Sequence, residues 1–410
     1  MSEADQAHAT VLRFLVHHGY GDTAEAFIRE AGARVDPSVV INADIPDDIF
    51  NDDAEETRLA EDVARHLSLH ASGNPRNANA NELAEGDDDY YTTLTKSMSS
   101  IHESNIIAVA IAPQTHLLAT GSTDKSVKIC NPKDSNDILH SYTHHTAPVM
   151  SIEFHPIYPQ YMLTTSMDGT AVLANIENEQ SIECQRFKDH QKYIVRGIFS
   201  KDGQFMATAS YDRTICIYKT TQDVQYTLLK RLGPFLGNVE TICFLDSSVL
   251  VAGIRDDNYL HYIHLPDLRH EKYNMNANGD DWVSFSPLWL SASPDGQYLL
   301  CSTDHVSGRM ILFETHSARQ VQNYYDKPTD DNFVMRRHCW HASGRYFYTA
   351  GADAVVHVIE AKTGRVVHRL TGHKNMVRTM AMDPDLGLVT GGYDHCVNVW
   401  NKPINNILNR

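Results

Sequence analysis

An aspartate-centred stretch, Gly121-Ser-Thr-Asp124, recurs along this chain at a constant spacing. Its next three copies are Thr165-Ser-Met-Asp168, Ala209-Ser-Tyr-Asp212 and Gly253-Ile-Arg-Asp256, so the four aspartates lie 44 residues apart. Each aspartate is followed about three residues later by a short apolar run. A repeat of this length, with a turn aspartate between two strands, is typical of a propeller built from four-stranded blades.

Three further aspartates continue the repeat towards the C-terminus. They are Asp304, Asp353 and Asp394, at steps of 48, 49 and 41 residues, and they bring the number of units to seven. Turn sequences such as Ser200-Lys-Asp-Gly203 separate strand-like runs inside the units. The sequence therefore predicts an all-β fold, a seven-bladed β-propeller that occupies residues 90–410.

The two ends of this region are expected to meet. The chain ends soon after Trp400, a third-strand position in the last unit, so the last blade lacks an outer strand of its own. Residues 91–98 precede the first unit and have a strand-like composition. Their pairing with the last blade would close the ring and remove an open sheet edge.

The bulk composition argues against several classes of protein. The chain has 410 residues, a formal net charge of -17, and 42% hydrophobic and 21% charged residues. The acidic charge disfavours nucleic-acid phosphate as the main ligand, and no apolar run reaches the roughly 20 residues of a membrane helix. Seven cysteines without a C-x-x-C pair argue against a disulfide framework or a zinc module. We expect a protein of the cytoplasm, the nucleus or both.

Residues 1–35 are expected to form two short helices. Apolar side chains share one face of the first helix, Gly19 can end it, and Asp22 or Thr23 can cap the second. Two short helices cannot bury an apolar stripe alone, so they need a partner, and a second copy of the same segment would serve.

This segment resembles the Lis-homology (LisH) motif. The resemblance rests on Leu15, Gly19-Tyr20, Thr23-Ala24, Phe27 and Glu30-Ala31-Gly32. Because the motif dimerises in that family, the resemblance implies a dimer through an apolar set that comprises Val11, Leu12, Leu15, Tyr20 and Phe27. The alternative is a helical hairpin that packs on its own propeller.

Residues 36–89 are expected to form an acidic, largely disordered linker. Clusters of acidic residues open and close the segment, and residues 74–82 offer few side chains to bury. One island at 57–68 places three apolar residues at helical spacing, namely Leu59, Val63 and Leu67. This island either extends the dimer interface, docks on a partner, or lies on the surface as an isolated amphipathic helix.

The units around the aspartates resemble the repeats of the WD-repeat family. The last unit is the closest, with Gly372-His373, Gly391-Gly-Tyr-Asp394 and Val397-Asn-Val-Trp400. In that family a histidine before the first strand, the turn aspartate, a serine or threonine and a third-strand tryptophan form a buried hydrogen-bond network. The resemblance implies four structural histidine–aspartate pairs, which are His102–Asp124, His145–Asp168, His190–Asp212 and His373–Asp394.

No unit is expected to carry the whole network. The tryptophan position is mostly lost, and the last unit has Trp400 but places Gly392 where a hydroxyl is expected. Unit four lacks the histidine, unit six offers Asp331 instead, and unit five has a longer turn. In the first three units the hydroxyl is expected from Ser122, Ser166 and Ser210.

WD-repeat proteins usually dock partners on the face that carries the aspartate turns. The residue before each aspartate points outward there, which implies a partner-binding set at Thr123, Met167, Tyr211, Arg255, Thr303, Ala352 and Tyr393. Basic residues are expected beside this set, namely Arg196, Arg336 and Arg378 on strands and Lys192 and Lys374 in loops. Such a rim suits an acidic or phosphorylated peptide. The alternatives are ordinary solvated side chains and docking of the chain's own acidic linker.

No catalytic signature is present in the sequence. It contains no P-loop, H-E-x-x-H, G-x-S-x-G or glycine-rich dinucleotide loop, and we expect no cofactor and no metal. The cluster His338-Cys-Trp-His341 resembles a set of metal ligands. Neighbours on a strand point to opposite faces, however, which favours core packing for His338 and Trp340.

The sequence therefore predicts a non-catalytic scaffold. A LisH dimer would present two propeller faces to protein or peptide partners within a larger complex. Three alternatives stay open. They are a substrate-recognition or regulatory subunit of a ubiquitin-ligase, transcription or RNA-processing complex, an enzyme that uses the central channel, and a nucleic-acid-binding propeller.

Overall fold

The computed structural model describes residues 90–99, 101–133, 138–177, 182–222, 224–325, 336–350 and 353–403. The chain divides into two units, residues 1–77 and residues 78–410, and only the second contains described residues. The helices expected in residues 1–35, the linker of residues 36–89 and its island at 57–68 therefore lie outside the described residues. Within the described ranges, no helix has the length and hydropathy needed to cross a membrane.

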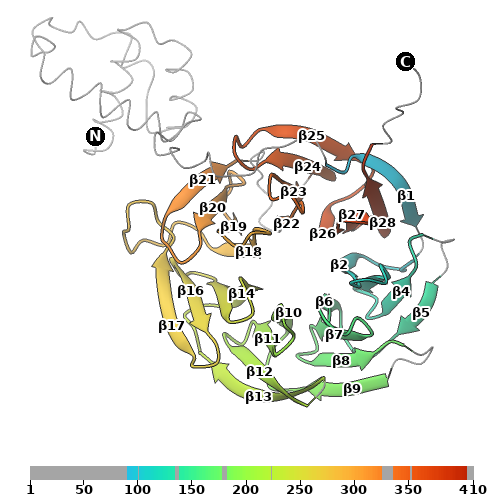
Figure 1. Cartoon of the computed structure of the whole chain (residues 1–410), viewed down its shortest axis with the longest axis horizontal. Coiled ribbons are helices and arrows are strands. Elements are labelled where there is room, and N and C mark those ends of the chain that lie inside the picture. The colour runs from blue at the N-terminus through green and yellow to red at the C-terminus, as the bar shows by residue number, and fades with distance from the viewer. Residues whose placement is uncertain are drawn as a thin grey trace, which may run out of the picture. The chain divides into compact units, whose positions relative to one another are not determined.

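Seven four-stranded antiparallel sheets are arranged as a ring (Figure 1). Apart from the sheet that closes the ring, each sheet uses four strands that are consecutive in the chain. The first strand of each sheet lies innermost, so β2, β6, β10, β14, β18, β22 and β26 surround the axis of the ring (Figure 1). The prediction of an all-β, seven-bladed β-propeller is confirmed.

The first four blades occupy residues 106–274. Blade 1 comprises β2 Ile106–Ile111, β3 Leu118–Ser122, β4 Val127–Cys130 and β5 Ile138–Tyr142. Blade 2 comprises β6 Val149–Phe154, β7 Tyr161–Ser166, β8 Ala171–Asn175 and β9 Ile182–Phe187. Blade 3 comprises β10 Ile194–Phe199, β11 Phe205–Ser210, β12 Ile215–Gln222 and β13 Gln225–Leu232. Blade 4 comprises β14 Val239–Phe244, β15 Val249–Ile254, β16 Tyr259–His264 and β17 Arg269–Asn274.

The last three blades complete the ring. Blade 5 comprises β18 Pro287–Ala292, β19 Tyr298–Thr303, β20 Met310–Glu314 and β21 Gln320–Tyr324. Blade 6 comprises β22 Arg337–Trp340, β23 Tyr346–Ala350, β24 Val355–Glu360 and β25 Val366–Thr371. Blade 7 comprises β26 Val377–Asp383, β27 Gly387–Gly392, β28 Cys396–Asn401 and, as its outer strand, β1 Thr93–Ser99.

The two ends of the propeller meet in blade 7. Strand β1 runs antiparallel to β28, with Thr93 opposite Asn401 and Met98 opposite Val397. Tyr91 strengthens this junction, because its hydroxyl donates to the carbonyl of Pro384 at 2.9 Å. This is the pairing expected from the sequence for residues 91–98. Because β28 is covered by β1, its outer edge presents no free row of backbone groups.

Seven apolar clusters of described residues lie between neighbouring blades. Between blades 3 and 4, for example, Ala207 and Ile217 pack with Ile242 and Leu250. Equivalent clusters join every other neighbouring pair, including blades 7 and 1. Each blade therefore buries its two faces against two neighbours. The second strands show the result, since β15 is buried at all of its residues, whereas the outer strand β13 is mostly exposed.

A register shift interrupts the innermost strand of six blades near its start. In blade 4 the shift falls between Val239 and Thr241, which makes Glu240 the extra residue. A bulge of this kind turns a side chain away from the regular alternation. The extra residues lie at the end of each strand that adjoins the aspartate turn, and they are Ile107, Met150, Val195, Glu240, Leu288 and Arg378.

Replacing Met98 by alanine is expected to destabilise the closed ring. Met98 is 1% exposed and belongs to the cluster between blades 7 and 1, so the substitution leaves a cavity that costs about 2–5 kcal/mol. Leu94→Ala on the same strand is the matched control, because Leu94 is exposed and its loss is expected to cost less than about 0.5 kcal/mol. Urea unfolding followed by tryptophan fluorescence measures both. Equal losses of stability would contradict a structural role for β1.

Candidate docking face

A series of hydrogen bonds joins four residues of blade 7. Trp400 Nε1 donates to Thr390 Oγ1 at 2.9 Å, and the same oxygen lies 2.8 Å from His373 Nε2. On the other side of the ring, His373 Nδ1 lies 3.0 Å from Asp394 Oδ2. The expectation that no unit carries the whole network is therefore wrong. The hydroxyl comes from Thr390, two residues before Gly392, because the second strand points that side chain at the histidine.

Blades 1 to 3 repeat this arrangement without the tryptophan. Each histidine Nδ1 lies 2.9–3.1 Å from an aspartate, and each Nε2 lies 2.8–2.9 Å from a threonine hydroxyl. The sets are His102 with Asp124 and Thr120, His145 with Asp168 and Thr164, and His190 with Asp212 and Thr208. The serines expected in this role instead accept the backbone N–H of the aspartate, and they are Ser122, Ser166 and Ser210.

Sequence reasoning missed these threonines although a signal was present. In all four units a threonine precedes the aspartate by four residues. A second hydroxyl also follows the aspartate by two residues in blades 1 to 3 and donates to its Oδ1 at 2.6–2.7 Å, from Ser126, Thr170 and Thr214. The constant spacing of these hydroxyl residues from the aspartate is visible in the sequence. Which hydroxyl contacts the histidine depends on the direction of each side chain, which only the structure gives.

Burial and hydrogen bonding set the charge states of these networks. Burial lowers the pKa of all four histidines, although the neighbouring carboxylates oppose this effect. Burial acts to raise the pKa of the four aspartates, but the N–H, hydroxyl and imidazole groups around them hold it below its usual value. A neutral imidazole has a single N–H group, and an ionised carboxylate can only accept a hydrogen bond. The imidazole proton is therefore on Nδ1, which lies next to the aspartate. The pairs are thus engaged in structural hydrogen bonds.

Blades 4 to 6 depart from this pattern. In blade 4 the repeat spacing selects Asp256, but Asp256 is exposed, and the buried Asp257 instead receives His261 Nε2 at 2.9 Å. The turn of blade 4 is one residue longer than those of blades 1, 2, 3 and 7, and for this reason the spacing points to the wrong aspartate. In blade 5 the longer turn is present between β19 and β20. In blade 6, Asp331 lies outside the described residues.

A second repeated hydrogen bond ties each aspartate turn to the loop before the first strand. In five blades the N–H of the residue before the aspartate donates to a loop carbonyl at 2.8–3.1 Å. The donors and acceptors are Thr123 and Asn105, Met167 and Pro148, Tyr211 and Tyr193, Arg255 and Asn238, and Tyr393 and Met376. The side chains at these positions therefore stand on a backbone that is held at two points.

Two side chains of this face form a charged cluster with Glu240 of β14. Glu240, whose side chain is 1% exposed, accepts Arg255 Nε at 2.6 Å and the Tyr211 hydroxyl at 2.8 Å. The hydrogen bond to Glu240 raises the pKa of Arg255, and burial raises the pKa of Tyr211. The sequence did not single out Glu240. Its only signal is an acidic residue inside the apolar strand β14.

The other expected members of the face divide into exposed and buried residues. Met167 is 40% exposed, Lys192 and Lys374 are exposed, and Tyr393 is partly exposed. We name Met167, Tyr211, Arg255, Lys374 and Tyr393 the docking face. Three further expected positions are corrected. Arg336 and Arg378 are only 3% and 6% exposed, and Thr303 is fully buried.

The physical reason for these corrections is local. Arg378 is the extra residue of the bulge in β26, which turns it into the wall of the ring, and burial lowers its pKa against the opposing effect of Tyr393. Arg336 occupies the corresponding place before β22. Thr303 Oγ1 donates to the carbonyl of Arg309 across the longer turn. Ala352 and the expected dimer set, Val11, Leu12, Leu15, Tyr20 and Phe27, lie outside the described residues.

The histidine-rich stretch of blade 6 does not gather around one point. His338 and Trp340 are both buried, as expected for one face of β22, and His338 Nδ1 lies 2.7 Å from Ser302 Oγ. His341 instead contacts Ser343 Oγ at 2.8 Å. Burial lowers the pKa of His338 to about 3. It is therefore a neutral core residue.

Two other groups among the described residues bring three possible metal ligands within 4.8 Å of one another. In the group of His264, Glu271 and His316, the carboxylate of Glu271 already pairs with Arg269 at 2.9 Å and accepts the Tyr273 hydroxyl at 3.0 Å. In the second group, of His116, Asp383 and Asp385, the histidine directs its two nitrogens at different carboxylates, at 3.1 and 3.6 Å. One imidazole cannot direct both nitrogens at one ion. In both groups the carboxylates already contact protein side chains.

Comparison with known protein families gives two matches. The family described as "WD domain, G-beta repeat" matches residues 94–131, 136–174, 182–219 and 364–401. The LisH family matches residues 9–31. Each matched repeat contains the outer strand of one blade and the first three strands of the next blade, which is blade 1, 2, 3 or 7. These four blades hold the histidine–threonine–aspartate networks.

The chain is also similar to several characterised proteins. It is 30% identical over 220 residues to the transcriptional corepressor LEUNIG_HOMOLOG of Arabidopsis thaliana, a match that covers 50% of this chain and 25% of the relative. It is 21% identical over 279 residues to striatin of Mus musculus, covering 63% of this chain and 35% of striatin. It is 22% identical over 255 residues to WD repeat-containing protein 1 of Bos taurus, covering 58% and 38%. The matches thus span about a quarter to two-fifths of each relative.

Thr390→Val is expected to destabilise the protein more than Thr390→Ser. Valine keeps the shape of the side chain but leaves His373 Nε2 and Trp400 Nε1 without their hydroxyl partner, and each unpaired buried group costs about 1–3 kcal/mol. Serine keeps the hydroxyl and loses one methyl group, which costs about 0.8 kcal/mol. Denaturant unfolding compares the two variants. Equal stabilities would contradict the four-residue network of blade 7.

Proposed function

Because this chain is a WD-repeat β-propeller protein with a LisH motif at residues 9–31, we propose that it is a non-catalytic scaffold that binds protein or peptide partners through the docking face. The residues that first suggest chemistry, the buried histidines and aspartates of blades 1, 2, 3 and 7, are engaged with one another. Their hydrogen bonds stabilise the aspartate turns, and these turns hold the outward side chains in place.

The observation that carries this proposal is the position of Arg255. Its Nε is bound by the buried carboxylate of Glu240, while its side chain remains 38% exposed. Tyr211 also interacts with this guanidinium. A guanidinium held in this way loses little side-chain entropy when a carboxylate or phosphate of a partner binds its exposed part. Lys192 and Lys374 add positive charge in neighbouring loops, whereas the exposed Asp256 opposes it.

Dimerisation through the LisH motif completes the proposal. A dimer would hold two docking faces on one particle, so that a partner with two binding segments, or a multimeric partner, is bound with an increased effective concentration. The apolar set of the motif, Val11, Leu12, Leu15, Tyr20 and Phe27, is the proposed dimer contact. A hairpin that packs on its own propeller would leave the protein a monomer.

A second candidate is a regulatory subunit of a transcription complex. It is favoured by the similarity to a protein named as a transcriptional corepressor, and it would place the chain in the nucleus for part of its life. The similarity to striatin carries no such indication. A ubiquitin-ligase, RNA-processing or nucleic-acid-binding role has no comparable support, and the net charge of -17 opposes the last of these.

Disrupting the LisH stripe is expected to convert a dimer into a folded monomer. The change is Leu15→Asp with Phe27→Asp in the full chain, because charged groups on an apolar contact prevent its burial. Light scattering is expected to give about half of the wild-type mass, with an unchanged propeller unfolding midpoint. Arg13→Asp, in the same segment but off the stripe, is the control and should leave the mass unchanged. A wild-type protein that is already monomeric would contradict the proposal.

Weakening the docking face is expected to abolish partner binding without unfolding the propeller. Alanine at Tyr211 or Arg255 would strand the buried carboxylate of Glu240, so the test uses Arg255→Lys, which keeps a cation beside it but removes the fork. Met167→Ala and Lys374→Ala complete the variant. Proximity labelling in cells measures the partners, and the unfolding free energy should stay within about 0.5 kcal/mol of wild type.

The matched control for the face variant lies on the outer strands. It carries Leu139→Ala, Lys230→Ala and Arg369→Lys, which are exposed positions on β5, β13 and β25. The control should label the same partners as wild type. If the face variant also labels them, partners bind elsewhere and the docking face is misplaced.

A further inference from the structure

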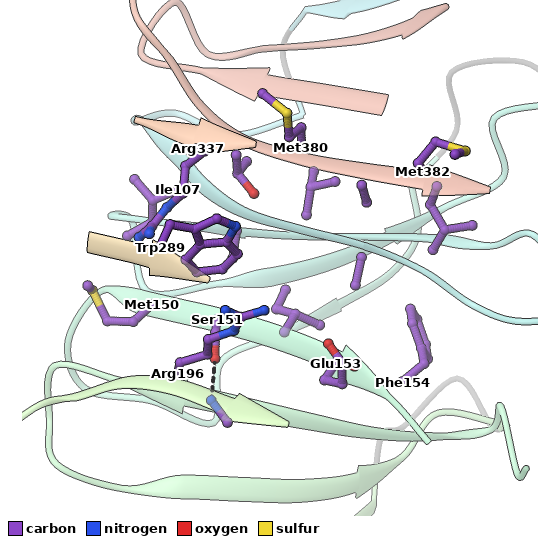
Figure 2. A pocket seen from close by; sticks show the side chains of 18 of the residues that line it. Ile107, Met150, Ser151, Glu153, Phe154, Arg196, Trp289, Arg337, Met380 and Met382 are labelled. Atoms are coloured by element: carbon purple, nitrogen blue, oxygen red, sulfur yellow. Dashed lines mark hydrogen bonds between the residues drawn. The ribbon is translucent and has the colours of Figure 1, made fainter. Parts of the chain in front are cut away.

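A cavity of about 330 Å³ occupies the centre of the propeller. Its lining comes from the innermost strands of six blades, β2, β6, β10, β18, β22 and β26 (Figure 2). It reaches Pro113 and Pro156, which follow β2 and β6 at the end remote from the aspartate turns. No residue of the docking face lines it. The cavity is therefore a separate site, and what binds there does not depend on the proposed scaffold function.

Two guanidinium groups in this cavity stack on the same indole ring. The Cζ atoms of Arg196 and Arg337 lie 3.6 and 4.0 Å from the centroid of the Trp289 ring. Two groups so close to one centroid can only lie on opposite faces of the ring, and Figure 2 shows Trp289 between the two arginines. Stacking of this kind holds each guanidinium plane in a fixed orientation.

Only part of each guanidinium is used by the protein. Arg196 Nη1 donates to Thr241 Oγ1 and to the carbonyl of Leu290, both at 3.0 Å, and Arg337 Nη1 donates to the carbonyl of Leu288 at 3.3 Å. The remaining nitrogens have no hydrogen-bond partner among the described residues. They are also not among the buried side-chain nitrogen and oxygen atoms that lack a hydrogen-bond partner. They are consequently open to the cavity that both side chains line.

The cavity carries more positive than negative charge. Among the described residues, no carboxylate forms an ion pair with Arg196 or Arg337. Burial lowers the pKa of Arg337, and the nearby positive charges of Arg378 and Arg196 lower it further, whereas the negative charge of Glu240, which does not line the cavity, opposes this effect. The one carboxyl group in the lining is Glu153, and burial raises its pKa to about 7. The lining thus holds two guanidinium groups and one acid that is only half ionised at neutral pH.

The walls beside this charged centre are apolar. Ile107 and Met150 line the cavity at the end where the two arginines and Trp289 lie, and Met382 and Phe154 line its other end (Figure 2). The volume lies near the lower end of the range for small-molecule sites, which combine apolar walls with a few fixed polar groups. A ligand with one anionic group and a short apolar body would match both features.

We propose that the central cavity binds a small organic anion, a carboxylate or a phosphate ester, whose oxygens bridge the guanidinium groups of Arg196 and Arg337. Both groups lie within 4.0 Å of the same ring centroid, so one oxyanion at the edge of the indole reaches nitrogens of each. Arginine suits this task because it presents parallel N–H donors to carboxylate and phosphate oxygens. Glu153 weakens binding when it is ionised, since it places a like charge in the same space.

The test measures binding of pentanoate and of butyl phosphate, each with one anionic group and a short apolar body, to the full chain by isothermal titration calorimetry, at an ionic strength held constant with sodium chloride. One saturable site per propeller is expected. Arg337→Met should weaken binding at least about tenfold, because charged hydrogen bonds are lost. A buried charge replaced by an apolar side chain of similar length often leaves the fold intact. Arg309→Met is the matched control, at an arginine of blade 5 outside the cavity lining, and should leave binding unchanged.

Glu153→Gln supplies an independent readout, because it is expected to tighten binding. The gain should be about threefold or more at pH 8, where the wild-type carboxyl is mostly ionised, and should shrink at pH 6. The charged group that acts on Glu153 is Arg196 from β10, while His338 from β22, which also lines the cavity, is uncharged in this range. A gain with both probes supports the shared oxyanion chemistry, and the tighter probe shows whether carboxylate or phosphate ester is preferred.

Two results would overturn the proposal. One is failure of both anions to bind, which would mean that the arginines are stabilised by the indole and by solvent alone. The other is binding of hexaglutamate but of neither small anion, with the same dependence on Arg337. That outcome would assign the cavity to an acidic side chain of a partner and not to a free small molecule.

Discussion

The packing of each blade against two neighbours is the constraint on which this structure depends. The apolar clusters lie between sheets and not within them, and the second strands of the blades are buried on both faces. A single blade therefore has no core, and the buried area is complete only when the ring closes. Strand β1 has this role, because it supplies the outer strand of blade 7 and places Met98 in the cluster between blades 7 and 1.

Closure of the ring also determines which polar groups bond to one another and which remain exposed. Inside the ring, the histidines and aspartates of blades 1, 2, 3 and 7 bind one another and the threonines of the second strands, so they support the turns. A buried network that is fully satisfied gives rigidity. Arg255 lies in the turn of blade 4 between β15 and β16, and the buried Glu240 binds its Nε while its side chain remains 38% exposed.

At the axis of the ring, by contrast, polar groups remain that the protein does not fully pair. Seven innermost strands bring together residues that are far apart in the sequence, and the lining of the central cavity ranges from Ile107 to Met382. Arg196, Trp289 and Arg337 come from three different blades and form one stacked unit. No local pattern marks such a unit, because each of its members looks like an isolated residue in an apolar strand.

The amino-acid sequence by itself determined the number of blades, the four histidine–aspartate pairs and the closure by residues 91–98, because each depends on a spacing or on local strand composition. It failed wherever one residue changes the direction of a side chain. The bulge in β26 buried Arg378, a longer turn moved the role of Asp256 to Asp257, and Thr390 replaced the hydroxyl expected at Gly392. Only the tertiary structure decided the Glu240 cluster and the arginine–tryptophan stack. Side chains alternate with a period of two along a strand, so an unseen insertion of one residue reverses the side on which a residue lies.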